Sequence, residues 1–176
     1  VGQLRDGLRS AAEDAGVRAV VLGHTGGTFS AGADLSEASG GDPYDAAVAR
    51  SREMTALLRS IVECPVPVIA AIDGHVRAGG MGLIGACDIV VAGPRSTFAL
   101  TEVRIGVAPA MISLTLLPKL APRAAARYYL TGETFNAKRA ADIGLVTITA
   151  DDVAFAVNAV TADLAKASPQ GLAASK

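Results

Sequence analysis

Two glycine-bearing segments and one glutamate are the residues of this chain best suited to chemistry. The first segment, residues 29–35, reads Phe-Ser-Ala-Gly-Ala-Asp-Leu, and the second, residues 73–82, reads Asp-Gly-His-Val-Arg-Ala-Gly-Gly-Met-Gly. Glu102 follows the next predicted strand pair. Glycines at turns into helices let backbone N–H groups approach a ligand closely and aim helix N-termini at negative charge. Such groups can stabilise an oxyanion, so the pattern points to an enzyme, although tight turns and close helix–strand packing alone would also require glycine.

Helix and strand patterns alternate along the chain and must position these segments. Apolar spacing predicts helices from residue 4 up to Gly16 and over residues 43–63, 79–86, 110–120, 123–130, 137–143 and 151–167. Strands are predicted over residues 17–22, 66–72, 89–92, 97–100 and 145–148. Asp42 is a plausible cap and Pro43 a first-turn proline, whereas Pro122 should separate two helices.

One strand is informative about the sheet. Residues 66–72 are too uniformly apolar for a half-exposed strand, which places them inside a sheet covered on both faces. Repeated strand, helix, strand units imply right-handed crossovers and a largely parallel sheet, so the expected fold class is α/β. The length fits a single domain over residues 1–176.

Composition excludes several classes of protein. With 51% hydrophobic and 19% charged residues the chain is globular, and with 4% aromatic residues its core must be built from Ala, Val, Leu and Ile. The net charge of −1 offers no cationic surface for nucleic acid. Cys64 and Cys87 have no ligand-spaced partners, which argues against a disulfide framework or zinc site and favours a reducing, cytoplasmic setting. No apolar stretch reaches the ~18 residues of a membrane span, so no membrane partner is expected.

Five ordered segments resemble the enoyl-CoA hydratase/isomerase (crotonase) superfamily. They are residues 29–35, 67–74, 79–82, 86–89 and 98–106, and the stretches 130–133, 141–146 and 168–171 agree. One glycine cluster alone would be weak evidence, but collinear segments at compatible spacing are strong evidence. The resemblance implies a spiral of βαβ units, an acyl-CoA substrate, no metal or redox cofactor, and a homotrimer or dimer of trimers. Because family members are longer at both ends, N-terminal strands and C-terminal helices are expected to be missing from residues 1–176.

The resemblance also assigns roles to individual residues. The backbone N–H groups of Ala33 and Gly79 would hold the thioester carbonyl, and one such donor is typically worth ~10²–10³ in rate. Glu102 matches the second catalytic glutamate of the family. Its alternative role is an exposed carboxylate that caps the next turn or pairs with Arg104. Further substrate contacts are expected at Ser30, Ala31, Asp34, Leu35, Gly80, Gly82 and Ala110.

One position departs from the pattern of two-glutamate hydratases. Their first glutamate would fall at Gly82, so this chain has one carboxylate fewer. Hydration by Glu102 alone would require it to act in both proton transfers, or a neighbour or second water to help, whereas isomerisation of a double bond needs a single carboxylate. If the glycine leaves room, Gly82→Glu should raise hydration. A bacterial branch that resembles methylglutaconyl-CoA hydratase also has glycine here, which keeps the hydratase hypothesis first.

The remaining candidates have plain structural alternatives. Asp34 could cap the helix after the first segment, and Ser36 stands where the family often has a lysine for coenzyme A phosphate. His24 and His75 flank predicted strand ends and fit loop or surface roles better than that of a general base. Ala110 begins a predicted helix, and its N–H could orient the reacting water.

These residues support three candidate functions, which we rank in order of preference. The first is hydration of a 2-enoyl-CoA, the second is isomerisation of a 3-enoyl-CoA to a 2-enoyl-CoA, and the third is acyl-CoA binding without catalysis. Neither acyl chain length nor branching is determined by these residues.

Overall fold

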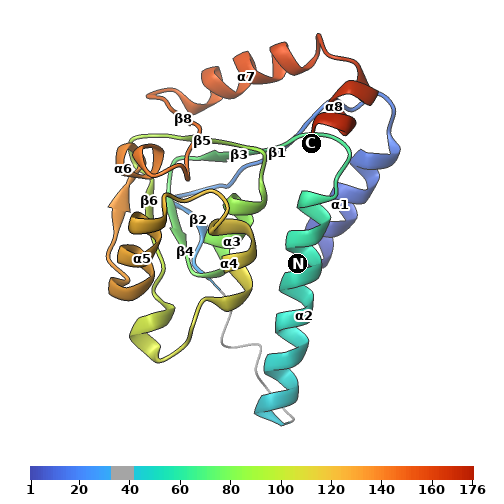
Figure 1. The fold of residues 1–176 in the computed structure, drawn as a ribbon. Helices are drawn as coiled ribbons and strands as arrows, with labels where there is room; N and C mark the ends of the chain where they lie inside the picture. Colours follow the sequence, from blue (N-terminus) through green and yellow to red (C-terminus); the bar gives the residue numbers. More distant parts are fainter. Residues whose placement is uncertain (33–41) are drawn as a thin grey trace.

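Two four-stranded sheets form the centre of the molecule (Figure 1). The structure is a computed structural model that describes residues 1–32 and 42–176. The first sheet has the order β1 (Val20–Leu22), β3 (Val68–Ile72), β5 (Ile89–Ala92) and β8 (Ile148–Thr149). The second has the order β2 (Thr28–Ser30), β4 (His75–Arg77), β6 (Thr97–Ala99) and β7 (Phe135–Asn136). Every pairing is parallel except that of β6 with β7.

Helices connect successive turns of a spiral in which the chain adds a strand to the first sheet and then to the second. They are α1 (Gly2–Glu13), α2 (Pro43–Val62), α3 (Gly79–Ala86), α4 (Ala110–Leu116), α5 (Pro122–Thr131), α6 (Ala137–Asp142), α7 (Val153–Leu164) and α8 (Pro169–Ser175). A short 3₁₀ helix, η2 (Glu102–Ile105), follows β6. The predicted α/β class with largely parallel sheets is confirmed.

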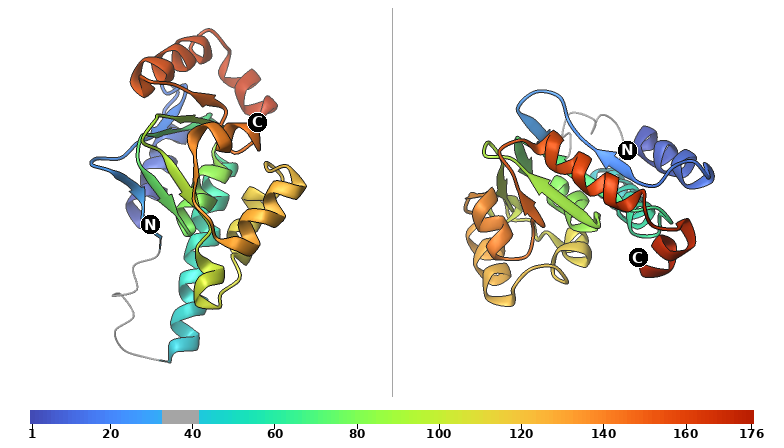
Figure 2. Two further views of the ribbon diagram at one scale, coloured as in Figure 1. Left: turned by 90° about the vertical axis from the view of Figure 1, so that its left-hand side faces the viewer. Right: turned by 90° about the horizontal axis from the view of Figure 1, so that it is seen from above.

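The central strands are covered on both faces, as the apolar run at 66–72 predicts. Ile69 and Val91 pack on one side with Val157 of α7, which lies across that face of the first sheet (Figure 2). Val68 and Ala70, next to Ile69 on β3, point the other way into the main core. This alternation follows from the two-residue period of a strand.

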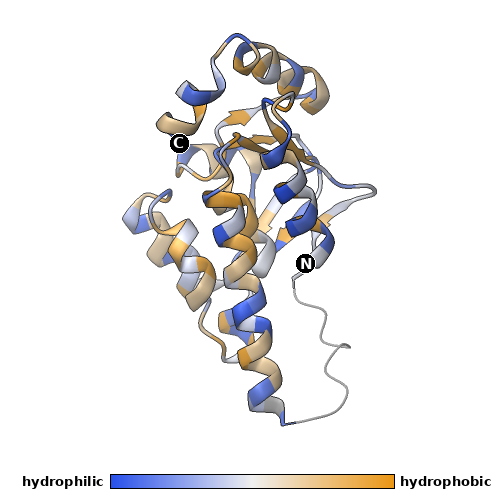
Figure 3. Ribbon diagram, turned by 90° about the vertical axis from the view of Figure 1, so that its right-hand side faces the viewer, coloured by the Kyte–Doolittle hydropathy of each residue, from blue (hydrophilic) through white to orange (hydrophobic). Residues whose placement is uncertain are grey.

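Some predicted elements have the expected bounds. Helix α3 spans Gly79–Ala86, and Asp42 caps α2 by accepting a hydrogen bond from Tyr44 N at 2.8 Å, with Pro43 as the first helical residue. Helix α2 projects beyond the rest of the molecule and alternates hydrophilic and hydrophobic segments (Figure 3). Its first buried residue is Leu57.

Other predictions were wrong in detail. The strand predicted at 145–148 is reduced to Ile148–Thr149, because the N–H groups of Leu145 and Val146 donate to Ala140 O and so stay with the end of α6. Strands β2 and β4 were not predicted, since each has only three residues. Pro122 begins α5, and the preceding helix ends at Leu116.

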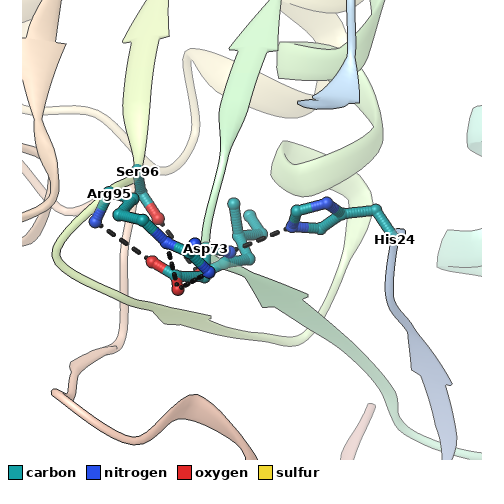
Figure 4. Close-up of polar contacts among 5 residues, drawn as sticks. His24, Asp73, Arg95 and Ser96 are labelled. Carbon is teal, nitrogen blue, oxygen red and sulfur yellow. Dashed lines mark hydrogen bonds and ion pairs between the residues drawn. The ribbon is translucent and has the colours of Figure 1, made fainter. Parts of the chain in front are cut away.

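A polar network holds the turn at which the chain passes from β3 to β4 (Figure 4). His24 Nε2 accepts from Asp73 N at 3.0 Å, and the Asp73 carboxylate binds the Arg95 guanidinium at 2.6 and 2.8 Å. The hydrogen bond with Arg95 holds the pKa of Asp73 below its usual value. Ser96, which is fully buried, donates to Ile72 O. A side chain at Gly74 would collide with Gly27 O at 2.5 Å, so glycine is required there.

No helix in the described part of the chain is both long and apolar enough to cross a membrane.

Candidate active site

The chemically interesting segments lie at one edge of the second sheet. Strands β2, β4 and β6 are adjacent and parallel, so their carboxyl ends meet at the same edge. Residues 31 and 32 follow β2, Gly79 begins α3 after β4, and Glu102 begins η2 after β6. Carboxyl ends of parallel strands are where open sheets place their ligands. Three stretches separated by up to seventy residues of sequence are therefore brought together.

The two glycine segments come into direct proximity. Gly32 has a φ of +108°, and a Cβ on it would lie 3.1 Å from the Cβ of Ala78. A Cβ on Gly80 would lie 2.5 Å from that of Ser30, so β2 ends tightly against the first turn of α3. These short distances explain why residues 32 and 80 are glycines, because neighbouring side chains leave little space for a Cβ at either position. Ala33, Asp34 and Leu35, along with Ser36, lie outside the described residues, and Ala31 is exposed.

The start of α3 presents Gly79 as a backbone donor. Ala78 has φ 46° and ψ −121°, a conformation that non-glycine residues rarely adopt, and it turns the chain sharply into the helix. Ala78 O accepts from Met81 N, whereas the N–H of a first helical residue has no acceptor within its own helix. The N-terminus of α3 therefore offers a hydrogen-bond donor and the positive end of a helix dipole.

Glu102 lies half-buried at the start of η2. Its Oε2 is buried and accepts no hydrogen bond from any described residue, and burial raises the pKa of the carboxyl group. No ion pair joins Glu102 to Arg104 in the described part of the chain, so the predicted alternative of such a pair has no support there. A carboxyl group whose pKa is raised is better suited to both accept and return a proton than an ordinary carboxylate is.

The condition set for Gly82→Glu, that the glycine leaves room for a carboxylate, is not met in the structure. A Cβ at Gly82 would lie 2.8 Å from the Cβ of Ile112 on α4 and closer still to its Cγ2. Thr115 Oγ1 also donates to Gly82 O at 3.0 Å, which draws α4 onto α3. Residue 82 must be glycine because α3 and α4 pack closely there.

The expected role of Ala110 also meets a difficulty. Helix α4 begins at Ala110 as predicted, but its N–H donates to Ala108 O at 2.8 Å. That donor is already engaged and is not free to orient a water.

Both histidines have structural roles. His24 supports the turn after β3, and its ring packs edge-on to Phe29 with centroids 5.8 Å apart. His75 Nδ1 lies 2.8 Å from Thr97 Oγ1 across β4 and β6. These contacts agree with the loop and surface roles predicted for them.

Two side chains near Glu102 were missed by sequence reasoning. Tyr129 on α5 has a buried hydroxyl without a hydrogen-bond partner among the described residues, and the charge of Glu102 contributes to raising its pKa, after burial. Ser113 on α4 lies beside it. Neither belongs to a glycine motif, so no signal in the sequence marked them.

Two hollows formed by described residues lie elsewhere. One of about 390 Å³ is lined by Gly93, Lys138 and Asp151 among others, and one of about 210 Å³ lies between α1 and the end of α2. Neither is lined by Glu102 or Gly79. No group of three or more His, Cys, Asp or Glu side chains in the described part of the chain could hold a metal ion.

Comparisons with known proteins agree with this fold. A crystal structure from Mycobacterium avium paratuberculosis K-10 is 69% identical with a TM-score of 0.93, covering 99% of this chain and 67% of that one. An enoyl-CoA hydratase from Mycobacterium avium is 66% identical with a TM-score of 0.92, covering 99% and 66%. A curated relative from Mycobacterium tuberculosis, (7aS)-7a-methyl-1,5-dioxo-2,3,5,6,7,7a-hexahydro-1H-indene-carboxyl-CoA hydrolase, is 33% identical over 176 residues, which is 98% of this chain and 70% of the relative.

The chain spans between about half and 70% of the length of the curated relatives that it matches. The family described as enoyl-CoA hydratase/isomerase matches residues 1–176. The chain therefore belongs to the enoyl-CoA hydratase/isomerase family.

Proposed function

We propose that this chain binds an acyl-CoA and hydrates a 2-enoyl-CoA with Glu102 as its single acid–base residue. The observation that supports this most is the meeting of both glycine segments and Glu102 at the carboxyl edge of β2, β4 and β6. The N–H groups of Ala33 and Gly79 would hold the thioester oxygen, where negative charge develops when water adds.

One carboxylate is sufficient for both proton transfers of the hydration. Ionised Glu102 removes a proton from water as the water oxygen bonds to Cβ, and the electron pair of the double bond moves to form an enolate. The neutral carboxyl group then returns that proton to Cα as the enolate reverts to the thioester. Burial favours this cycle because it raises the pKa of Glu102 and so lowers the cost of the protonated intermediate state.

Isomerisation of a 3-enoyl-CoA is the second candidate, and the packing of Gly82 favours it. With Ile112 against Gly82, no second carboxylate faces the substrate from α3. A single carboxylate that moves a proton between Cα and Cγ satisfies isomerisation without activating a water. The third candidate, acyl-CoA binding without catalysis, keeps the same donors and needs no turnover.

A substrate panel separates these functions. Purified protein is given crotonyl-CoA, a branched 2-enoyl-CoA such as methylglutaconyl-CoA, and a 3-enoyl-CoA, while binding of butyryl-CoA is measured by calorimetry. Loss of enoyl absorbance with the first two supports hydration, and the branched substrate tests the finer resemblance to the methylglutaconyl-CoA branch. Turnover of the 3-enoyl-CoA alone would replace hydration by isomerisation. Binding without any turnover would leave an acyl-CoA-binding protein.

We also propose that the protein assembles as a homotrimer or dimer of trimers. Large apolar side chains are exposed from η2 to α5, and such patches are typical of interaction surfaces. They are Val103, Ile105, Val107, Leu114, Leu117 and Leu130. Sedimentation velocity tests the proposal, and a monomer at micromolar concentration would contradict it.

A further inference from the structure

Two of the three side-chain atoms that are buried without a hydrogen-bond partner in the described part of the chain lie on elements that pack together. They are Oε2 of Glu102 and the hydroxyl of Tyr129. Helix α5, which carries Tyr129, packs against η2, which carries Glu102. Buried polar atoms are nearly always satisfied, because leaving one unpaired costs free energy, so two unpaired atoms on packed elements require an explanation.

Few other side chains around Glu102 Oε2 and the Tyr129 hydroxyl could serve as their hydrogen-bond partners. Ser113 lies beside the Tyr129 hydroxyl and lowers its pKa, but Ser113 donates its own proton to Pro109 O at 2.7 Å. Ser113 does not complete the hydrogen bonding of Tyr129. Helix α4, over Ala110–Leu116, carries no titratable side chain, and the ring of Tyr129 packs against the main core.

The other charged residues of η2 and α5, which are Arg104, Arg123 and Arg127, are exposed. Arg104 of η2 reaches Gly132, where its Nε would lie 3.1 Å from an added Cβ. Arg127 of α5 forms an ion pair with Glu133 at the surface. The Tyr129 hydroxyl is thus an unpaired proton donor on the helix that packs against η2, and the charge of Glu102 contributes to raising its pKa, after burial.

We propose that Tyr129 is the positioning residue of Glu102, its phenol donating a hydrogen bond to Oε2 and leaving the other carboxylate oxygen for the substrate. This proposal rests on the proposed function of Glu102 as acid–base residue.

Such a hydrogen bond has a defined electrostatic effect. Burial raises the pKa of Glu102, and a donor to the ionised form lowers it again. Removal of the phenol hydroxyl must therefore raise the pKa of Glu102 further. It must also free the carboxylate to rotate, which slows chemistry more than it weakens substrate binding.

Tyr129→Phe tests the proposal, with Tyr128→Phe as its matched control. Tyr128 is the adjacent residue of α5, is 3% exposed, and its hydroxyl accepts from Arg139 Nε at 3.0 Å. Tyr129→Phe should lower kcat roughly 10- to 100-fold, the value of a hydrogen bond to a charged group, with little change in KM. The acidic limb of the pH–rate profile should move to higher pH. Tyr128→Phe should leave kcat and that limb unchanged, and its main effect should be on stability.

Measuring the pKa of Glu102 directly makes the test independent of turnover. Carbon-13 NMR of labelled glutamate follows the carboxyl group in the wild type and in Tyr129→Phe, with Glu102→Gln to assign the signal. A higher pKa of Glu102 in Tyr129→Phe than in the wild type would support the hydrogen bond between Tyr129 and Glu102. If the protein turned over no thioester, that result would still stand, and only the proposed reaction would be contradicted. Unchanged kcat, pH limb and pKa in Tyr129→Phe, or equal effects of the two variants, would overturn the proposal.

Discussion

At the scale of single residues, Gly82 shows most clearly that the sequence does not reveal which side chain packs against a given residue. Its type and position are consistent with an open site for a second carboxylate, yet a Cβ there would collide with Ile112, thirty residues further along the chain. The glycine is visible in the sequence, whereas the residue that fills its space depends on how α4 packs on α3.

Gly82→Ala should lower the free energy of unfolding by about 1–3 kcal/mol, because the new methyl group overpacks the contact with Ile112. Gly7→Ala is the matched control, since Gly7 also lies in a helix but has nothing within 4 Å of an added Cβ. That change should stabilise the protein by about 0.5–1 kcal/mol. Urea unfolding measures both, and the cost at Gly82 should shrink in the Ile112→Ala background. A Gly82→Ala protein as stable as the wild type would refute the packing account.

Glu102 should reduce stability at neutral pH. Its pKa in the folded protein is raised above the ordinary 4.5, so the folded state binds its proton more tightly than the unfolded state does. Stability from this group is therefore complete below pH 4.5 and is lost as pH rises through the folded pKa. Glu102→Gln, which cannot ionise, should be more stable than the wild type at neutral pH and similar to it below pH 4.5. Urea midpoints at both pH values test this, and a variant that is less stable at neutral pH would contradict it.

At the scale of elements, periodicity predicted most of what was found. The helix at 79–86, the cap of α2 and the buried strand in the first sheet follow from local patterns of residue type and spacing. The three-residue strands β2 and β4 do not, because their pairing is decided by the spiral and not by their own composition. The sequence therefore predicted the segments of the site but not the sheet edge that joins them.

Helix α3 should contribute to catalysis through the N–H of Gly79. Gly79→Pro removes that donor at a first helical position, where proline is tolerated, and should lower turnover about 10²–10³-fold. Gly79→Ala is the control, because it adds a comparable Cβ near the flexible end of Met54 but keeps the N–H. It should retain most of the activity. Equal turnover in a folded Gly79→Pro protein would remove Gly79 from the oxyanion site.

At the scale of the whole molecule, one lysine ties together segments distant in sequence. Lys176, whose side chain is 9% exposed, pairs with Asp88 at 2.8 Å and donates to Ile61 O at 2.9 Å and Val66 O at 3.2 Å. Asp88 also accepts from Val68 N at 2.7 Å. The end of α8 is thereby fixed to the end of α2 and to the strands β3 and β5. Such a network of long-range contacts leaves no periodic signal in the sequence.

Lys176→Met should lower the free energy of unfolding by about 1–3 kcal/mol, because it leaves the partly buried Asp88 carboxylate and the carbonyls of Ile61 and Val66 without their donor. Lys166→Met is the control, since Lys166 pairs with Asp163 at the surface with both side chains more than 70% exposed. That pair should be worth less than about 1 kcal/mol. Urea unfolding compares the variants, and equal losses would show that burial of Lys176 adds nothing.

The central claim is that Glu102 carries the chemistry of an acyl-CoA enzyme, and its most direct test compares crotonyl-CoA hydration by the wild type and Glu102→Gln. The variant keeps the shape of the side chain but cannot accept a proton from water. We predict that kcat falls about 10²–10⁴-fold while calorimetric binding of butyryl-CoA is nearly unchanged. A folded Glu102→Gln protein that hydrates crotonyl-CoA at the wild-type rate would contradict the account.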